Sequence, residues 1–346
     1  MARKQKKSKI RILMIVFLIL LGIWFVFRLG YNAPLVFDEN TQIEIQEWDT
    51  LAKFYSSLDG YHKFMMKLWL RNHKALIPSL QKGKYVLGGS YQKKELLEQI
   101  AKGPEKAFVR VTLLEGRSIY DIDQELTSKG LIQAWTFIAK ANDLAFIQKL
   151  KSEFSSLSIL PEGKSLEGFL YPDTYFLDQN WDLSEQLVTA QLKNFQQKIW
   201  DSYHDRIVAF WHGLSPYQVV ILASVIENEE KTSQNKPIIA GIFLNRLERG
   251  MKLDADVTLC YGLKITYDKC RQNIVPNLSD ANNPYNTRQV FGLMPTPISS
   301  PSEETLSALL NFQKTDYLFY LHDQAGGIHY GLTNEEHISN VATYLR

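Results

Sequence analysis

The sequence predicts an α+β protein with an N-terminal transmembrane helix, a small α/β module and a larger mixed α+β domain. Three observations predict this organisation. A long apolar run lies near the N-terminus, and two stretches then pass from strand-like alternation to helical periodicity. The remainder mixes helices, short strands and long polar loops, with no linker dividing it.

The apolar run is the predicted membrane anchor. Residues 12–27 are apolar apart from Gly22, and flanking residues extend the run toward the ~20 that a helix needs to cross a bilayer. We therefore predict a basic cytoplasmic tail at 1–11 and a transmembrane helix at 12–29, with the rest exported under the positive-inside rule. A cleaved signal peptide is the alternative, and it also exports the chain.

The charge balance argues against nucleic-acid binding. The formal net charge is +2, but six of the 39 basic residues lie within the first 11 positions. The remainder then carries 33 basic against 37 acidic residues, a net of −4. Such a balance gives no basic face that would neutralise phosphates.

A small module is predicted at 34–105. An alternating strand begins near Thr41 and turns into an amphipathic helix, a second strand runs from Lys82, and a helix spans 92–101. This β-α pattern resembles LysM-type glycan-binding modules. A spacer that only holds the catalytic unit away from the membrane is the alternative.

The predicted catalytic domain spans 106–346 and contains a helix of unusual composition. Ser215 can cap this helix, Pro216 suits its first position and Gln218 completes a capping box. The helix then runs through an apolar stretch to Glu227. Desolvation there would raise the pKa of this carboxyl, as a general acid requires. The alternative is that Glu227 and Glu229 form only the solvated tip of a buried helix.

Several motifs in a fixed order resemble the YceG-like (MltG) endolytic murein transglycosylases. The resemblance covers essentially the whole chain and implies that Glu227 is the catalytic glutamate, while departures at 287–288 and 294–296 affect loops. The motifs are Glu167-Gly-Phe-Leu-Tyr-Pro-Asp173-Thr-Tyr, Leu222-Ala-Ser-Val-Ile-Glu227, Ile242-Phe-Leu-Asn-Arg246-Leu, Gly250-Met-Lys-Leu-Asp-Ala-Asp256-Val-Thr-Leu-Cys-Tyr-Gly, Pro284-Tyr-Asn286-Thr, Gly292-Leu-Met-Pro and a closing run from Tyr317 through His329 to His337.

The resemblance implies a reaction that one carboxyl can perform. Glu227 would protonate the bond between N-acetylmuramic acid and N-acetylglucosamine, then take the proton of the muramoyl 6-hydroxyl as that oxygen closes on C1. The product is a 1,6-anhydro end. Because the sugar's own N-acetyl group can stabilise the cationic centre, the second carboxylate of ordinary glycosidases is unnecessary.

Six further residues are candidates for substrate binding, each with a structural alternative. Asp256 precedes a Val-Thr pair interpreted as a strand and could orient substrate or cap a turn. Asn245 and Arg246 lie on a helix predicted at 238–249 and could bind acetamido groups or tie the helix to the core. Asp173 follows Pro172 in a turn and carries the same ambiguity.

Two other candidates lie in a polar loop. Tyr285 and Asn286 combine an aromatic face with an amide, which suits sugar recognition. His329, Asn334 and His337 form a polar cluster whose spacing matches no strong metal-ligand motif, so loop hydrogen bonding is favoured. We expect no metal and no cofactor.

Three questions stay open at this level. Cys260 and Cys270 could form a disulfide in an oxidising compartment or remain thiols. A muramidase-like hydrolase using Glu227 and Asp256, or an inert membrane-tethered glycan-binding scaffold, are the alternative functions. The resemblance also implies a bacterial inner-membrane protein with a periplasmic catalytic domain, peptidoglycan strands as substrate, and partners among penicillin-binding proteins and the elongation or division machinery.

Overall fold

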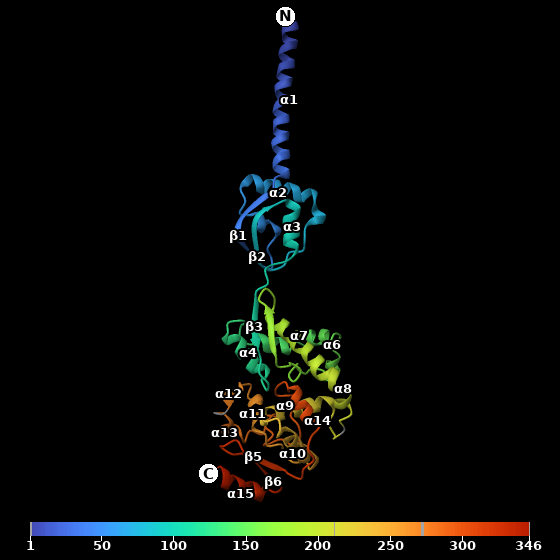
Figure 1. Cartoon of the computed structure of the whole chain (residues 1–346), viewed down its shortest axis with the longest axis vertical. Coiled ribbons are helices and arrows are strands. Elements are labelled where there is room, and N and C mark those ends of the chain that lie inside the picture. Colours follow the sequence, from blue (N-terminus) through green and yellow to red (C-terminus); the bar gives the residue numbers. More distant parts are fainter. Residues whose placement is uncertain (1, 211, 271–272, 346) are drawn as a thin grey trace. The chain divides into compact units, whose positions relative to one another are not determined.

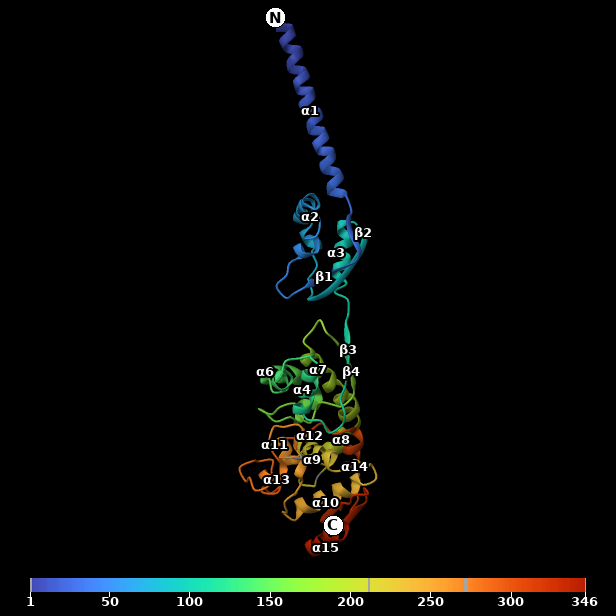
Figure 2. The same ribbon diagram turned by 90° about the vertical axis from the view of Figure 1, so that its left-hand side faces the viewer.

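The computed structural model describes residues 2–210, 212–270 and 273–345, without the side chains of residues 2–12, 267 and 268. The chain divides into two compact units. The first comprises residues 1–108 with 178–181, and the second comprises residues 109–177 with 182–346. Figures 1 and 2 show the elements of each unit from two sides.

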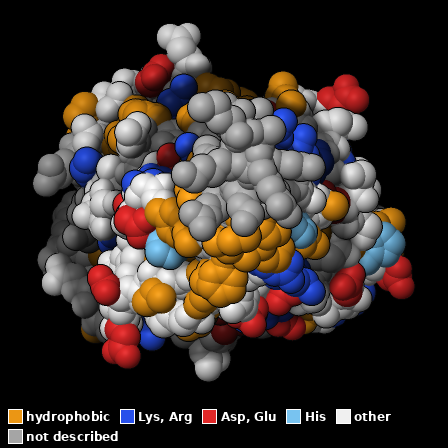
Figure 3. Space-filling model, turned by 90° about the horizontal axis from the view of Figure 1, so that it is seen from above, with side chains coloured by type: hydrophobic (Ala, Val, Ile, Leu, Met, Phe, Trp, Pro, Cys, Tyr) orange, Lys and Arg blue, Asp and Glu red, His pale blue; other side chains and the backbone are white. Residues whose placement is uncertain are grey.

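The chain begins with one long helix, α1 (Ala2–Asn32). Its segment Leu13–Asn32 has a mean hydropathy of 2.5 and is long and apolar enough to cross a membrane. The hydrophobic side chains of this segment are exposed rather than packed in a core. Figure 3 shows a continuous patch of hydrophobic side chains near the centre of the end-on view. Exposure of this kind suits lipid contact better than water contact.

The first unit is built on a two-stranded antiparallel sheet. Strands β1 (Leu35–Ile45) and β2 (Gly83–Tyr91) pair from Leu35 opposite Tyr91 to Ile45 opposite Gly83, with an irregularity between Phe37 and Thr41. Alternate residues of both strands are buried, and they pack with the helices on a single core. The remaining elements are η1 (Leu51–Tyr55), α2 (Gly60–Asn72), η2 (Lys74–Leu76) and α3 (Lys93–Ala101).

The local signals for this unit agree with the structure except at one point. The second strand and the helix after it form where they are predicted, and Gln92 and Glu95 close a capping box on α3. The prediction of a helix directly after β1 is wrong. Only a 3₁₀ turn follows there, and α2 begins at Gly60 because the Asp59 side chain accepts hydrogen bonds from the amides of Tyr61 and His62.

The second unit combines many helices with two small sheets, which confirms the mixed α+β class. Strand β3 pairs with β4, and β5 pairs antiparallel with β6. The elements are β3 (Phe108–Thr112), α4 (Ile119–Ser128), α5 (Thr136–Ala141), α6 (Leu144–Lys151), η3 (Ser155–Ile159), β4 (Thr174–Asp178), α7 (Leu183–Phe195), the π-helical turn η4 (Gln196–Trp200), α8 (Asp201–Val208), α9 (Pro216–Glu229), α10 (Lys236–Glu248), α11 (Asp256–Gly262), α12 (Tyr267–Cys270), α13 (Ile274–Asn277), α14 (Glu303–Leu310), β5 (Phe319–His322), β6 (Ile328–Gly331) and α15 (Asn334–Tyr344).

Helix α9 is the central helix of this unit. Ser215 caps it, Pro216 occupies its first turn and Gln218 completes the capping box, as predicted. Every residue from Val219 to Glu227 is buried, so the helix has no solvated face along most of its length. Helices α10 and α14 both pack against it. The end of α9 is therefore enclosed by the beginnings of two other helices.

One local prediction in this unit is wrong. The Val-Thr pair after Asp256 lies in helix α11 and not in a strand. The Thr258 hydroxyl donates to the carbonyl oxygen of Ala255 at 2.7 Å and contacts the Thr287 hydroxyl at 3.0 Å. These buried contacts satisfy the hydroxyl within a helical turn, so tertiary context overrides the β-propensity of the pair.

Candidate active site

Glu227 occupies the last turn of α9, and its residue is only 2% exposed. One carboxylate oxygen accepts hydrogen bonds from the backbone N–H of Ser302 at 2.8 Å and from its hydroxyl at 2.6 Å. The other oxygen lies 3.4 Å from Nζ of Lys236. The burial of Glu227 agrees with the prediction from its apolar helix, but its surroundings are not wholly apolar because Ser302 and Lys236 supply three donors.

Ser302 places this carboxyl at the start of another helix. It is the N-cap of α14, and its hydroxyl also accepts a hydrogen bond from the N–H of Thr305 at 3.2 Å. The N-terminus of a helix carries a partial positive charge and unpaired N–H groups. The carboxylate of Glu227 is therefore held where a negative charge is stabilised.

Lys236 links Glu227 to a second acidic group. Its buried ammonium lies 2.8 Å from the carboxylate of Glu304, and this hydrogen bond lowers the pKa of Glu304. Lys231 donates to the backbone carbonyl of Glu227 at 2.9 Å. Burial lowers the pKa of Lys231, while the negative charge of Glu227 acts in the opposite direction. Two cations thus approach the end of α9.

The two acidic residues after Glu227 are not a solvated helix tip. The hydroxyl of Tyr320 donates to Glu229 at 2.8 Å, and burial raises the pKa of that carboxyl. Glu230 is 3% exposed and lies 2.9 Å from Nε2 of His322. Both residues therefore tie α9 to strand β5.

Asp256 forms an ion pair with Arg288 at the start of α11. Both side chains are about two-fifths exposed, at 40% and 41%. The negative charge of Asp256 also contributes to the raised pKa of Glu229, after burial. Asp256 thus lies within electrostatic reach of the end of α9, with a side chain that solvent can approach.

Asn245 and Arg246 hold the chain that precedes β5. The amide of Asn245 donates to the carbonyl oxygens of Thr315 and Tyr317 at 2.6 and 3.1 Å. Arg246, 6% exposed, donates to the carbonyl oxygens of Leu318 and Leu253. Their hydrogen bonds favour the structural alternative for both residues.

Asp173 forms an ion pair and a hydrogen bond within the second unit. Its carboxylate lies 2.8 Å from Nζ of Lys198 and accepts a hydrogen bond from the amide of Asn194 at 3.1 Å. The bond from Lys198 lowers the pKa of Asp173. These contacts tie the start of β4 to helix α7 and its π-helical extension.

The two loop candidates face different surroundings. Asn286 is fully buried, and its amide donates to the carbonyl oxygens of Asn277, Leu278 and Asp280, so it shapes its own loop. The Tyr285 ring instead packs 5.0 Å from the ring of Tyr261 and lines a cavity of about 260 Å³. Only Tyr285 of this pair presents a side chain to a space that a ligand could enter.

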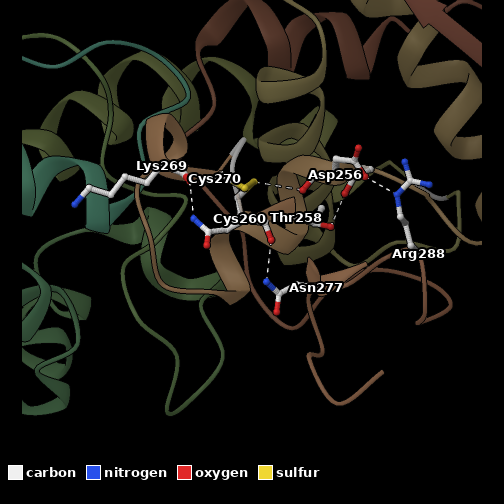
Figure 4. Close-up of a disulfide and its surroundings, with 9 residues drawn as sticks. Asp256, Thr258, Cys260, Lys269, Cys270, Asn277 and Arg288 are labelled. Atoms are coloured by element: carbon white, nitrogen blue, oxygen red, sulfur yellow. Dashed lines mark hydrogen bonds and ion pairs between the residues drawn. A yellow bond between two sulfur atoms is a disulfide. The ribbon is translucent and has the colours of Figure 1, made fainter. Parts of the chain in front are cut away.

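Cys260 and Cys270 form a disulfide, which answers a question that the sequence left open. It joins α11 to α12, with a Cα–Cα distance of 5.3 Å. Figure 4 shows Cys260 on the same helix as Asp256 and Thr258. The bond therefore restrains the segment that carries the Asp256–Arg288 pair.

The C-terminal histidines have partners within their own region. His329 lies 2.7 Å from the carboxylate of Asp323 and stacks on Tyr344, while His337 stacks on Phe319. Asn334 is the first residue of α15. Among the residues that the structure describes, no group of three or more His, Cys, Asp or Glu side chains is arranged to hold a metal ion.

Sequence reasoning missed the two closest partners of Glu227. Ser302, followed by Glu303 and Glu304, carries the signature of a helix start, and Lys236 precedes Pro237 in a similar position. Those signals locate α14 and α10. No local pattern shows that both helices begin beside a glutamate that is 75 residues from Ser302.

Comparisons with known proteins agree on one family. The model of the YceG-like family matches residues 43–343. An endolytic murein transglycosylase from Streptococcus pneumoniae is 29% identical over 77% of this chain and 51% of the relative, and one from Bacillus subtilis is 27% identical over 77% of this chain and 73% of the relative. The chain thus spans about half the length of the pneumococcal relative.

A solved structure has the same fold. The crystal structure of a YceG-like protein from Listeria monocytogenes superposes with a TM-score of 0.57 at 23% identity. The match covers 88% of this chain and 99% of the Listeria chain. The arrangement of elements is therefore shared well beyond the level of sequence identity.

Proposed function

The chain belongs to the YceG-like family, and from that premise we propose that it is an endolytic peptidoglycan lytic transglycosylase. It cleaves the β-1,4 bond between N-acetylmuramic acid and N-acetylglucosamine and leaves a 1,6-anhydro-muramoyl end. The relatives named endolytic murein transglycosylase support this activity. The observation that carries the proposal is the buried Glu227 carboxyl, held by donors from α10 and α14.

The donors around Glu227 suit an acid that becomes a base. When the protonated carboxyl gives its proton to the glycosidic oxygen, a carboxylate appears. Ser302 and the N-terminus of α14 stabilise one of its oxygens, which leaves the other oxygen to exchange the proton. The carboxylate then accepts the proton of the 6-hydroxyl, and that oxygen bonds to C1 in place of the departed sugar.

The same contacts define what substrate entry must change. Glu227 is almost inaccessible, and the two bonds from Ser302 are short, whereas the contact with Lys236 is 3.4 Å long. The Lys236 ammonium also has Glu304 as a second partner at 2.8 Å. We therefore infer that substrate displaces Lys236 toward Glu304 and reaches the carboxylate oxygen that it leaves.

Two of the binding candidates remain part of the proposal. Asp256 orients the glycan from the exposed edge of α11, and Tyr285 contributes an aromatic wall. Asp173, Asn245, Arg246 and Asn286 act through the positions of the segments they hold.

The proposed setting is the bacterial inner membrane. Helix α1 crosses the bilayer once, its basic N-terminus stays in the cytoplasm, and the catalytic domain at 106–346 lies in the periplasm. The module at 34–105 binds glycan in the manner of LysM modules. Penicillin-binding proteins and the elongation or division machinery are the proposed partners, because cuts in nascent strands occur beside the synthases.

The test compares three forms of the full chain in detergent: wild type, Glu227→Gln and Glu229→Gln. Glu229 is the matched control because it is a half-buried carboxyl on the same helix, with a pKa raised by burial and a hydrogen bond from Tyr320. Mass spectrometry of glycan ends released from peptidoglycan should detect 1,6-anhydro ends with wild type and Glu229→Gln. Loss of the acid/base group should lower the rate by a factor of at least ~10² in Glu227→Gln.

The products separate this proposal from its alternatives. Reducing ends in place of anhydro ends would mean that water attacks C1, as in a muramidase-like hydrolase. Glycan binding without cleavage by any of the three forms would mean an inert scaffold. Equal activity of wild type and Glu227→Gln would show that Glu227 is not the general acid/base.

A further inference from the structure

A cavity of about 350 Å³ opens in the second unit away from the end of α9. One wall is α4 with the turn that leads into α5, and the other is the segment after α11. The residues that line it include Tyr120, Asp123, Trp135, Lys264 and Lys269. None of them has a role in the proposed acid/base step.

Trp135 lies on this wall in a conformation that a bulky residue rarely adopts. Its φ is 71°, in the left-handed region, and its side chain is 60% exposed. The buried carboxylate of Asp123 accepts hydrogen bonds from the amides of Trp135 at 2.8 Å and Phe137 at 3.0 Å. Asp123 therefore holds a strained backbone conformation that presents a large indole to solvent.

Lys264 repeats this pattern on the opposite wall. It follows the end of α11 with a φ of 56°, at a position where glycine is usual. Among the described residues, four non-glycine residues have positive φ, and two of them, Trp135 and Lys264, line this one cavity. Strain that gathers in one place and carries functional side chains is typical of binding sites.

The charge of this cavity is also unbalanced. Lys264 and Lys269 are both exposed, and in the described part of the chain neither has an ion-pair partner. Asp123 is the acidic residue of the lining, and its carboxylate is already occupied by backbone amides. The cavity thus offers an aromatic face beside uncompensated positive charge.

Neighbouring cavities connect this one with the end of α9. It shares Tyr120 and Lys264 with the cavity that Tyr285 lines, and Ile265 with a smaller one that Asn228 lines. Asn228 directly follows Glu227, and the turn at Gly116 lies so close that an added Cβ would be 2.9 Å from its side-chain oxygen. Neighbouring hollows that share lining residues therefore lie between the glutamate helix and Trp135.

We propose that this cavity is a distal subsite for a peptidoglycan strand, in which the Trp135 indole stacks on an N-acetylated sugar ring and Lys264 and Lys269 bind a carboxylate of its peptide-bearing side arm. The inference rests on the proposed function for its ligand class. An aromatic ring suits the C–H face of a sugar, and the ammonium groups suit carboxylates, which the N-acetylglucosamine units lack. The subsite therefore favours strands with charged muramoyl side arms over neutral N-acetylglucosamine oligomers.

Two substitutions remove the side chains without opposing the backbone. Glycine adopts positive φ without strain, so Trp135→Gly and Lys264→Gly should leave the melting temperature unchanged or higher. Trp181→Ala is the matched control, because Trp181 is 55% exposed and does not line this cavity. Each change is made in full-length Glu227→Gln protein in detergent, so that binding is measured without cleavage.

Binding is measured by calorimetry with two probes: soluble glycan strands with stem peptides, and a neutral N-acetylglucosamine oligomer. Trp135→Gly should weaken binding of both probes by roughly tenfold, as for a central aromatic contact. Lys264→Gly should weaken binding of the peptide-bearing strands alone and reduce its dependence on salt. Trp181→Ala should change neither affinity.

The outcomes that overturn the inference are equally specific. Unchanged affinity in Trp135→Gly, or an equal loss of affinity in Trp181→Ala, would show that Trp135 does not stack on a sugar ring of the bound strand. An equal loss of affinity for both probes in Lys264→Gly would show that Lys264 does not bind a carboxylate of the strand. Because binding is measured apart from cleavage, absence of cleavage by wild type would refute the proposed function and leave these binding results intact.

Discussion

Glu167 is a buried carboxyl whose ionisation should control the stability of the second unit. It is 1% exposed, and its Oε2 accepts a hydrogen bond from the N–H of Ile119 at 2.9 Å. Its Oε1 has no hydrogen-bond partner within the described structure. Burial, with a smaller contribution from the negative charge of Asp121, raises the pKa of Glu167 to about 8, although the hydrogen bond from Ile119 acts in the opposite direction.

The sign of the effect follows from this raised pKa. The unfolded chain ionises near the ordinary value of 4.5, whereas the folded chain keeps the proton until about pH 8. The stabilising contribution is therefore complete below pH 4.5 and is lost as the pH rises to about 8. At 1.36 kcal/mol per pKa unit, the full loss is on the order of 5 kcal/mol, and about 3 kcal/mol of it has occurred at pH 7.

Glu167→Gln removes this dependence because an amide keeps the size of the protonated acid and does not ionise. Urea unfolding of wild type and variant between pH 4.5 and 8.5, followed by tryptophan fluorescence, gives two profiles of unfolding free energy. Their difference isolates Glu167, since the other titrating groups are common to both. Profiles that stay parallel over this range would refute the assignment of a raised pKa.

Three further predictions concern residues around α10 and α11. Arg246→Met should lower the free energy of unfolding by about 3–5 kcal/mol, because it removes two charged donors from buried carbonyl oxygens; a loss below 1 kcal/mol in urea unfolding would contradict this. Cys260→Ser should lower the free energy of unfolding by up to ~3 kcal/mol, as expected for a disulfide with a sequence separation of 10. Reductant should lower the free energy of unfolding of wild type by the same amount. Asp256→Asn should change the melting temperature little, since its half-exposed pair with Arg288 contributes less than about 1 kcal/mol. A tenfold fall in kcat/KM for glycan cleavage by this variant would place Asp256 on the substrate.

Local patterns predicted the helices whose ends carry strong signals. The capping boxes at Gln92 and Ser215 and the long apolar run of α1 are visible within a few residues of sequence. The prediction of a helix directly after β1 was wrong because the cap that starts the helix, Asp59, lies further along the chain. The prediction of a strand after Asp256 was wrong because the buried Thr258 hydroxyl bonds within a helical turn.

The candidate site also combines features that local sequence predicts with features that only the packing of distant segments determines. The burial of Glu227 could be predicted from the apolar residues that precede it on its own helix. Its pairing could not, because Lys236 and Ser302 reach it from α10 and α14. The contacts of Arg246 and Asn286 could not be predicted either, because these side chains donate to carbonyl oxygens in other segments or across their own loop.

The sequence by itself determined the membrane-length helix, the family, the mixed class and the glutamate at the end of a buried helix, because these depend on periodicity, caps and motif order along the chain. Only the tertiary structure decided what holds that glutamate, whether the cysteines are bonded and that Trp135 and Lys264 line one cavity. Hydrogen bonds, ion pairs and cavities join residues far apart in the chain, and their free energy depends on distances that only the packed fold sets.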